Sequence, residues 1–340
     1  MTDATGGRRP SDRAAVLVIE VGGTNLRAAR FDPATEGLAG RVHAPTPGSG
    51  AAPGPAASHR DLVATLQRLG AEALEGRPAG AVAIAYPGPI DGEGVVLSTP
   101  TLPGLSGPFP LRRACQEAWP DAVVLVTNDL TAAGYRYVGA GVDDFCVITV
   151  GSGIGHKVFV GGRPLVGPSG RGGEIGHLRV DHAPDALMCD CGAPGHLGGI
   201  ASGRGSVRLV AAAAARDPQG LRTSTLARDA EADEHAIAGS FRAGDAWVRS
   251  ALAPGVAALG HGIAAIHLAT GTERFILIGG FAFAMDESYR RMLVAAAHDA
   301  CWDVGQDWDA MIGFGVRDDD QGMLGAGLLA VRSGLTDGSW

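Results

Sequence analysis

The sequence predicts an α/β protein built from two topologically related halves. Short apolar runs of strand length alternate with segments of helical spacing along most of the 340 residues, which is typical of α/β folds. Two glycine-rich turns between strands, at residues 22–24 and 151–155, lie about 130 residues apart in similar local contexts. Such turns present backbone N–H groups to an anion. We therefore expect each half to offer one phosphate-binding cradle, with the halves closing on a nucleotide.

The composition argues against several classes of protein. A net charge of −8 is unsuited to a nucleic-acid-binding protein, which needs a basic face to replace counterions. Five cysteines, two of them in one short motif, indicate reduced thiols and a metal loop. The polar N-terminus and the lack of eighteen consecutive apolar residues predict neither a signal peptide nor a membrane-spanning helix. We expect a cytoplasmic protein of two domains or two lobes, without nucleic-acid or membrane partners.

The first half begins with a strand that ends in a carboxylate. Residues 1–13 are expected to form a disordered tail, and the apolar run Val16–Ile19 leads into Glu20. The turn Gly22-Gly23-Thr24-Asn25 follows, and residues 26–31 read as a second strand. This turn could hold an anion through its N–H groups and a hydroxyl. An ordinary hairpin turn is the more frequent explanation of such a segment.

The remainder of the first half alternates between helices and strands. Residues 33–59 are rich in Pro, Gly, Ala and Ser and are predicted to be mostly loop. The further predicted elements are a helix at 61–74, a strand at 81–85, turns at 86–92, a helix at 109–119, a strand at 123–126 and a helix at 131–137. The strand at 123–126 delivers Asn128 and Asp129 at its carboxyl end, where open α/β sheets bind ligands. Alone, an Asp there is more commonly a helix N-cap, and an Asn a turn former.

The second half repeats the order of strand, glycine turn and strand. A strand at 146–150 precedes Gly151-Ser152-Gly153-Ile154-Gly155, and residues 158–160 return as a strand. A strand at 275–278 leads into a third glycine turn, Gly279-Gly280. The segments with helical patterns are 206–215, 231–269, 288–300 and 325–333.

One stretch of the second half concentrates metal-ligating side chains. His177, Cys189, Cys191 and His196 fall within about twenty residues. Two thiolates and two imidazoles suit Zn²⁺ in tetrahedral geometry, and four protein ligands leave no position for a reactive water. Gly192 and Gly195 suit the tight turn of a chelating loop. A structural zinc site is the favoured interpretation, and two buried thiols with two surface histidines is the alternative.

Five motifs in this chain occur in the order found in the ROK family of sugar kinases and regulators, which it resembles over about residues 16–332. They are Glu20-Val21-Gly22-Gly23-Thr24, Asn128-Asp129, Gly151-Ser152-Gly153-Ile154-Gly155, Glu174-Ile175-Gly176-His177 and Cys189-x-Cys191-Gly192-x-x-Gly195-His196-Leu197. The resemblance implies a two-lobed actin/hexokinase-like ATPase fold with ribonuclease H-like duplicated domains and a zinc-binding loop. It implies a small lobe at 14–129, a large lobe at 130–324, and a C-terminal helix at 325–340 that returns to the small lobe.

The resemblance also implies a role for each motif. Asp129 would be the general base that takes the proton of the sugar hydroxyl. The residues expected to bind the sugar are Asn128, Asp129, Glu174 and His177. The residues expected to hold ATP, its phosphates and Mg²⁺ are Glu20, Gly22, Gly23, Thr24, Asn25, Gly151, Ser152, Gly153, Gly279 and Gly280. The expected zinc ligands are His177, Cys189, Cys191 and His196.

The chain departs from the family pattern at several positions. Glu20 stands where Asp is usual, which keeps the charge for Mg²⁺ with a longer reach, and His196 replaces a cysteine ligand. Gly198 stands where a sugar-binding Glu is usual, and the wall segment Thr101–Leu105 differs as well. His156 and Lys157 replace glycines after the second turn. Lys157 could reach a phosphate or face solvent, and we favour solvent.

These features predict an ATP- and Mg²⁺-dependent kinase that phosphorylates the 6-hydroxyl of a hexose or amino hexose. Glucose is the default substrate implied by the family. The altered sugar walls favour an amino sugar such as kanosamine, whose 3-ammonium would suit the Glu174 carboxylate. A sugar-binding regulator or sensor without turnover is the alternative, although the short segment before the first strand and the acidic charge argue against it. The resemblance implies a homodimer or homotetramer.

Overall fold

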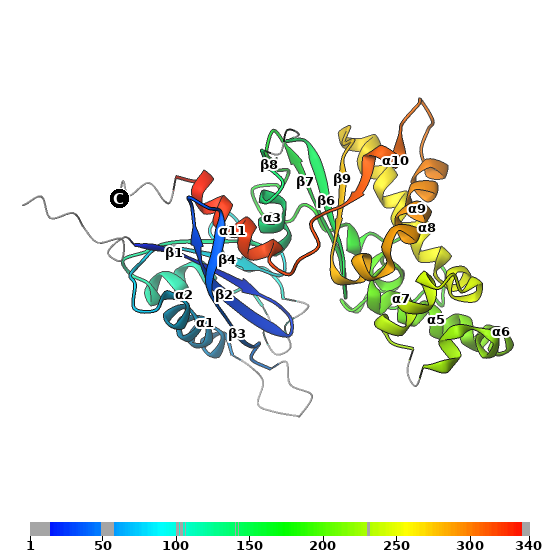
Figure 1. Ribbon diagram of the computed structural model, residues 1–340, viewed down its shortest axis with the longest axis horizontal. Coiled ribbons are helices and arrows are strands. Elements are labelled where there is room, and N and C mark those ends of the chain that lie inside the picture. Colours follow the sequence, from blue (N-terminus) through cyan, green and yellow to red (C-terminus); the bar gives the residue numbers. More distant parts are fainter. Residues whose placement is uncertain are drawn as a thin grey trace, which may run out of the picture. The chain divides into compact units, whose positions relative to one another are not determined.

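The computed structural model describes residues 14–48, 58–99, 102, 105, 107–139, 141, 143–229 and 232–334. The chain forms two compact units (Figure 1). Unit 1 comprises Met1–Val138, Val166–Gly172 and Asp319–Trp340, and unit 2 comprises Gly139–Leu165 and Gly173–Asp318. The predicted N-terminal tail lies outside the described residues, as do residues 101, 103 and 104 of the predicted sugar wall.

Unit 1 contains a five-stranded sheet in the order β3-β2-β1-β4-β5. Its strands are β1 (Ala15–Val21), β2 (Asn25–Asp32), β3 (Gly37–Pro45), β4 (Ala79–Tyr86) and β5 (Val123–Asn128). β1 and β2 form an antiparallel hairpin, whereas β1, β4 and β5 run parallel. The parallel strands therefore end at one edge of the sheet, where ligands bind in open α/β folds.

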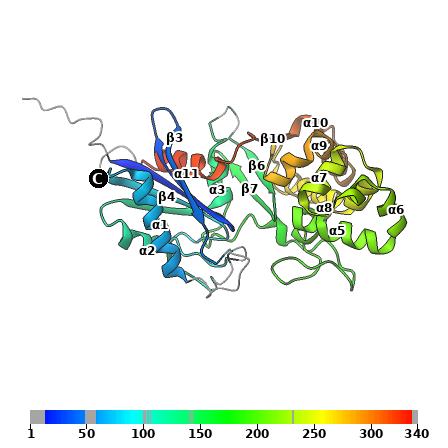
Figure 2. The same ribbon diagram turned by 60° about the horizontal axis from the view of Figure 1, so that its bottom comes forward.

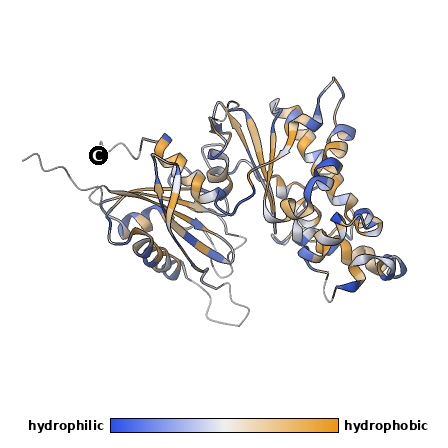
Figure 3. Ribbon diagram, viewed as in Figure 1, coloured by the Kyte–Doolittle hydropathy of each residue, from blue (hydrophilic) through white to orange (hydrophobic). Residues whose placement is uncertain are grey.

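Helices cover both faces of this sheet (Figures 1 and 2). α1 (His59–Leu74) and α2 (Leu111–Ala118) pack on one face against side chains such as Leu17 and Ile19. α3 (Asp129–Tyr135) and α11 (Gln321–Arg332) pack on the other, against Val16 and Val18. Alternate residues of β1 thus enter two cores, which explains why its sequence is an apolar run without polar alternation. Figure 3 shows that the strands are predominantly hydrophobic.

Unit 2 repeats the topology of unit 1. Its sheet has the order β10-β9-β6-β7-β8, with strands β6 (Phe145–Val150), β7 (Ile154–Val160), β8 (Arg163–Pro164), β9 (Phe275–Ile278) and β10 (Ile312–Phe314). β6 and β7 form an antiparallel hairpin, and β6, β9 and β10 run parallel. Read from β8 to β10, the order and directions are those of β3 to β5. The prediction of two topologically related α/β halves is confirmed.

The helices of unit 2 build a large helical core. They are η2 (Ile175–His177), α4 (Gly198–Ala201), α5 (Gly203–Arg216), α6 (Pro218–Thr223), η3 (Thr225–Arg228), α7 (Glu234–Arg242), α8 (Ala246–Thr270), α9 (Gly280–Ala300) and α10 (Trp308–Met311). In the part of the chain that the structure describes, α8 is the one helix long and apolar enough to cross a membrane. Its buried residues, including Leu252, Leu259 and Ile263, belong to the core that α9 completes. We therefore interpret α8 as a core helix.

The structure adds detail to two of the predicted segments. The segment 33–59, predicted to be mostly loop, contains β3. This edge strand buries little of its surface, so its sequence lacks the apolar alternation that marks a half-buried strand. The helical pattern at 231–269 is two helices, α7 and α8, because Gly244 takes a φ of 83° and the Asp245 side chain caps α8 by accepting from the Val248 N–H.

Candidate active site and metal centre

An acidic cluster lies at the carboxyl edge of the sheet in unit 1. Glu20 is the second-last residue of β1, and its carboxylate pairs with the Arg27 guanidinium across the β1–β2 hairpin at 2.7 Å. Burial raises the pKa of Glu20 to about 7, opposed by Arg27 and reinforced by the charges of Asp129 and Asp320. A Cβ atom at Gly322 would lie 2.7 Å from the Glu20 carboxyl carbon, so α11 approaches this closely only because that residue is glycine. Clustered carboxylates with excess negative charge are suitable ligands for Mg²⁺.

Asn128 and Asp129 join β5 to α3. The Asn128 side chain is the N-cap of α3: its oxygen accepts from the N–H groups of Leu130 and Thr131, at 3.1 Å each. Its amide nitrogen donates to the Gly88 carbonyl at 3.0 Å and to the Asp129 carboxylate at 2.9 Å. The N-cap is therefore the Asn, and Asp129 is the first helical residue and is half-buried. Its carboxylate is held by the Asn128 amide and by the Leu130 N–H, which donates at 2.8 Å. This arrangement leaves Asp129 a carboxylate held at a strand end, suited to accept a proton.

The first glycine turn is a tight connection between β1 and β2. The Gly22 N–H donates to the Asn25 carbonyl at 3.0 Å, and a Cβ atom at Gly22 would lie 2.7 Å from that oxygen. The Thr46 hydroxyl donates to the Gly22 carbonyl at 2.7 Å, which ties the turn to the end of β3. Thr24 and Asn25 are exposed. A turn fixed in this way presents polar groups at constant positions, as a phosphate cradle requires.

The other two glycine segments lie close together in unit 2. The turn after β6 is closed by the Gly151 N–H, which donates to the Gly153 carbonyl at 3.0 Å, and Ser152 is exposed. Gly279, with a φ of 102°, lies beside the end of β6, because a Cβ atom there would be 2.6 Å from the Val150 carbonyl. Gly280 opens α9, a helix without a side-chain N-cap. Unsatisfied N–H groups at a helix start favour an anionic or polar ligand.

The Glu174 carboxylate forms an ion pair with Lys157, a residue that we expected to face solvent. Lys157 is 2% exposed, and its Nζ atom lies 3.1 Å from Oε1 of Glu174, whose side chain is 31% exposed. The expectation that Lys157 faces solvent is therefore wrong. It belongs to β7 between two buried or half-buried neighbours, and its charge is stabilised by the Glu174 carboxylate.

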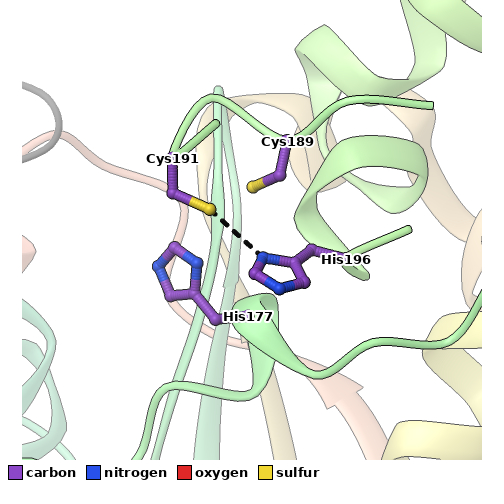
Figure 4. Close-up of side chains that lie close together, drawn as sticks. All are labelled: His177, Cys189, Cys191 and His196. Atoms are coloured by element: carbon purple, nitrogen blue, oxygen red, sulfur yellow. Dashed lines mark hydrogen bonds between the residues drawn. The ribbon is translucent and has the colours of Figure 1, made fainter. Parts of the chain in front are cut away.

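Four side chains in unit 2 point toward a common centre (Figure 4). The ligand atoms of His177, Cys189, Cys191 and His196 all lie within 4.8 Å of one another. The Cys191 sulfur lies 3.2 Å from Nδ1 of His196, and the two imidazole rings meet edge to face. Burial and the nearby His177 lower the pKa of His196, which keeps the ring neutral and able to bind a metal. The donor set and its spacing fit Zn²⁺, which prefers sulfur and imidazole nitrogen in tetrahedral geometry.

Backbone conformation and ion pairs shape the loop that carries the thiols. Gly192 and Gly195 take φ values of 88° and 75°, as predicted for the tight turn, and a Cβ atom at Gly195 would lie 1.9 Å from the Asp181 carbonyl. Asp190 binds Arg204 and Arg208, both on α5. Gly198 follows at the start of α4, where a Cβ atom would be 3.1 Å from the Gly176 carbonyl and 3.7 Å from the Cys189 sulfur. The position of the family's glutamate is therefore adjacent to the metal ligands.

Within each unit, the structure groups most of the predicted residues. Unit 1 brings Glu20, Asn128 and Asp129 to the edge formed by β1, β4 and β5, and unit 2 brings Gly151–Gly153 to Gly279. Our sequence analysis missed Asp320 and Arg27 as members of the acidic cluster. Arg27 could have been found from hairpin register, since it lies opposite Glu20. Asp320 is remote in sequence and carries no local signal beyond a run of three aspartates before a helix.

The raised pKa of Glu20 predicts a pH-dependent requirement for Mg²⁺. Because the fold favours the protonated form, the carboxylate that a cation needs is lost as the pH falls through about 7. We expect the Mg²⁺ concentration for half-maximal activity to rise up to about tenfold per pH unit below that value, as one proton competes with the cation. Without Mg²⁺, stability should fall as the pH rises from 4.5 to about 7, since the native state holds the extra proton over that window.

This requirement is measured by titrating Mg²⁺ in an ADP-release assay at several pH values. Glu20→Gln should make the Mg²⁺ concentration for half-maximal activity less dependent on pH. It should also raise that concentration at every pH. Glu93→Gln is the matched control, because Glu93 is an 83% exposed carboxylate of the same unit that pairs with Arg112. A half-saturating Mg²⁺ concentration that does not change between slightly acidic and slightly alkaline pH would contradict the assignment of Glu20.

Comparison with known proteins gives a consistent result. The sequence profile of the ROK family matches residues 16–333. A C(7)-cyclitol 7-kinase from Streptomyces hygroscopicus subsp. limoneus is 37% identical over 333 residues, which cover 93% of each chain. A ROK family glucokinase from Streptomyces griseus, solved with glucose and AMPPNP, superposes with a TM-score of 0.69 at 25% identity and covers 94% of this chain and 100% of its own. A ROK family transcriptional regulator, homologous to the E. coli MLC protein, has a TM-score of 0.76 at 21% identity over 95% of this chain and 79% of its own, and shows the fold alone.

Proposed function

Because the chain belongs to the ROK family, we propose that it is an ATP-dependent kinase that phosphorylates a hydroxyl group of a sugar or cyclitol. The observation that carries this proposal is the acidic cluster of unit 1. Asp129 stands at the end of β5, oriented by Asn128, and its charge acts on the Glu20 carboxyl. A base for the acceptor hydroxyl and carboxylates for a divalent cation are the two protein contributions that phosphoryl transfer from ATP requires.

Each group has a defined part in this chemistry. Asp129 accepts the proton of the attacking hydroxyl on its carboxylate. Glu20 and Asp320 would hold Mg²⁺, which would supply charge neutralisation at the phosphates. The Gly22 and Gly151 N–H groups close the two turns, and the N–H groups that follow them at residues 23–24 and 152–153 bind phosphate oxygens, while Gly279-Gly280 borders the adenosine. Glu174 and His177 hydrogen-bond the sugar hydroxyls, while Asn128 acts mainly through its hold on Asp129.

We assign the acceptor as a hydroxymethyl group on a six-membered ring. The C(7)-cyclitol 7-kinase matches 93% of this chain. If the ring of such a cyclitol has six carbons, its seventh carbon lies outside the ring, as carbon 6 of a hexopyranose does. A cyclitol therefore joins glucose and kanosamine as a candidate, and we rank it first. Gly198 supports this ranking, because it removes the carboxylate that the family pattern places beside carbons 1 and 2 of glucose.

We propose that His177, Cys189, Cys191 and His196 hold one structural Zn²⁺ that fixes the imidazole of His177 for its contact with the sugar. The ion supplies rigidity to the loop and no open coordination position. The homodimer or homotetramer implied by the family stays a prediction.

An ADP-release screen with ATP and Mg²⁺ tests the proposed function. The panel contains a hydroxymethyl cyclitol, glucose, mannose, glucosamine, N-acetylhexosamines and kanosamine. We expect turnover with the cyclitol or glucose, and phosphorus NMR of the product should place the phosphate on the hydroxymethyl oxygen. The alternative of a sugar sensor without turnover predicts measurable sugar binding with no ADP release above the background hydrolysis, and that result would overturn the proposal.

A further inference from the structure

We propose that Lys157 is a specificity-determining residue that neutralises Glu174, so that the enzyme selects a substrate that is uncharged where it meets Glu174. This inference rests on the proposed function, because it assigns Glu174 to sugar binding. It concerns a group outside the phosphate-transfer machinery. Lys157 is also the single lysine of the chain, which has 27 arginines. A chain that otherwise uses arginine places its one ammonium group in a buried position next to a proposed substrate ligand.

The position of Lys157 requires a fixed partner. Its side chain is 2% exposed, and burial of an unpaired ammonium is strongly unfavourable. Nζ lies 3.1 Å from Oε1 of Glu174 and 3.5 Å from the Gly173 carbonyl. The Glu174 side chain is 31% exposed, so the carboxylate stands between the buried cation and the surface. Nζ binds one oxygen of the carboxylate, which restricts the orientation of the other oxygen.

The surroundings of Lys157 select an ammonium group over a guanidinium group. Gly173 takes a φ of 85°, and a Cβ atom there would lie 2.6 Å from Cδ of Lys157 and 2.7 Å from its Nζ atom. The backbone therefore passes directly over the side chain. An arginine side chain is larger and ends in a planar, forked donor. The space between the Gly173 backbone and β7 is too small for that group.

The residue before Lys157 holds the backbone next to Glu174. Nδ1 of His156 accepts a hydrogen bond from the Ile175 N–H at 3.2 Å. Burial, and secondarily the charge of Lys157, lower the pKa of His156 to about 4, which is consistent with a neutral ring acting as acceptor. Two consecutive residues of β7 thus bind the chain at Glu174 and at Ile175. Both replace glycines of the family pattern, which offer no side chain for either contact.

The charge of the pair decides which substrates suit Glu174. An isolated carboxylate attracts an ammonium group and would favour an amino sugar. Here the lysine balances that charge, and an ammonium group on the substrate would also meet the repulsion of Lys157 at short range. The oriented carboxylate still accepts hydrogen bonds from hydroxyl groups. The pair therefore favours an uncharged polyol over kanosamine or another amino sugar.

The test compares a neutral polyol with its amino analogues, glucose with glucosamine and kanosamine, at a pH at which the amines are protonated. Kd values come from calorimetry without ATP, and kcat/KM values from ADP release. For the native enzyme, kcat/KM should be about tenfold or more higher for glucose than for its amino analogues, as expected for one charged contact. Lys157→Met should lower kcat/KM for glucose, mainly by raising KM. It should also raise the ratio of kcat/KM for the amino sugar to kcat/KM for glucose about tenfold. If Lys157 had only a structural role, its loss would lower kcat/KM for both substrates by the same factor and leave this ratio unchanged.

Two further variants keep the test independent of folding. Lys157→Gln keeps a polar side chain of similar length without the charge and should raise the ratio as Lys157→Met does, which separates the effect of charge from that of an apolar side chain. Lys157→Met combined with Glu174→Gln removes both charges and should return the ratio toward the native value. A ratio that stays within about twofold of native in Lys157→Met, or a native preference for an amino sugar, would overturn the inference. If no sugar yields ADP while the Kd ratio shifts as expected, the proposed function fails and the role of Lys157 stands. If neither sugar binds, both fail.

Discussion

We expect Asp129→Asn to lower kcat by at least about a hundredfold, with the Kd for the sugar nearly unchanged. The substitution preserves the shape of the side chain and removes only its ability to accept a proton. The contacts of Asn128 with Gly88, Leu130 and Thr131 do not depend on that charge, so the start of α3 should keep its geometry. The measurement is ADP release under saturating sugar and ATP, with sugar affinity from calorimetry.

The matched control for this variant is Asp121→Asn. Asp121 is exposed and precedes β5 at the end of the strand opposite to Asp129. The control should retain native turnover. Turnover within a few-fold of native in Asp129→Asn would exclude Asp129 as the base, and a loss shared equally by the control would point to general damage.

The second large effect concerns the metal. We expect the purified protein to contain about one zinc per chain and the Cys189→Ser/Cys191→Ser variant to contain none, because serine does not replace a thiolate ligand. The midpoint of thermal unfolding should fall by on the order of 10 °C, since the ion ties the loop to the segment of His177. The affinity for sugar should fall with it, because His177 loses the bond that fixes its ring.

Two variants control for this experiment. Cys301→Ser alters a half-buried cysteine of unit 2 that lies outside the four-ligand cluster and should keep the zinc. His196→Cys restores the ligand that the family pattern has at this position and should also keep it. Elemental analysis that finds no zinc in protein prepared without chelators would exclude the site. Zinc retained by the double serine variant would show that the metal lies elsewhere.

The glycine turns and the metal ligands could be predicted because their signals are local. A run such as Val16–Ile19 followed by two glycines restricts the backbone within a few residues, and the thiols and His196 are separated by only a short loop. Asn128 was harder to interpret. Its sequence context allowed a turn former or a sugar ligand, and only the hydrogen bonds to Leu130 and Thr131 show that it caps the helix.

The remaining features depend on contacts between distant segments. Lys157 was predicted to face solvent, and nothing near it in the sequence indicates that residue 174 supplies its partner. Asp320 acts on Glu20 from the start of α11, three hundred residues along the chain. β3 could not be recognised because an exposed edge strand is held by backbone hydrogen bonds to β2, which any sequence can make.

The repeated topology has a consequence for how the chain divides its chemistry. In the first hairpin, the residue two before the glycine turn is Glu20, paired with Arg27; in the second it is Thr149, paired with Gly155. Equivalent positions of the two hairpins thus differ in charge, with a charged pair in one hairpin and an uncharged pair in the other. Duplication of a fold leaves each copy free to specialise. At this position the first hairpin holds a carboxylate that a cation can bind, whereas the second holds an uncharged threonine, so a symmetric scaffold can support different chemistry in its two halves.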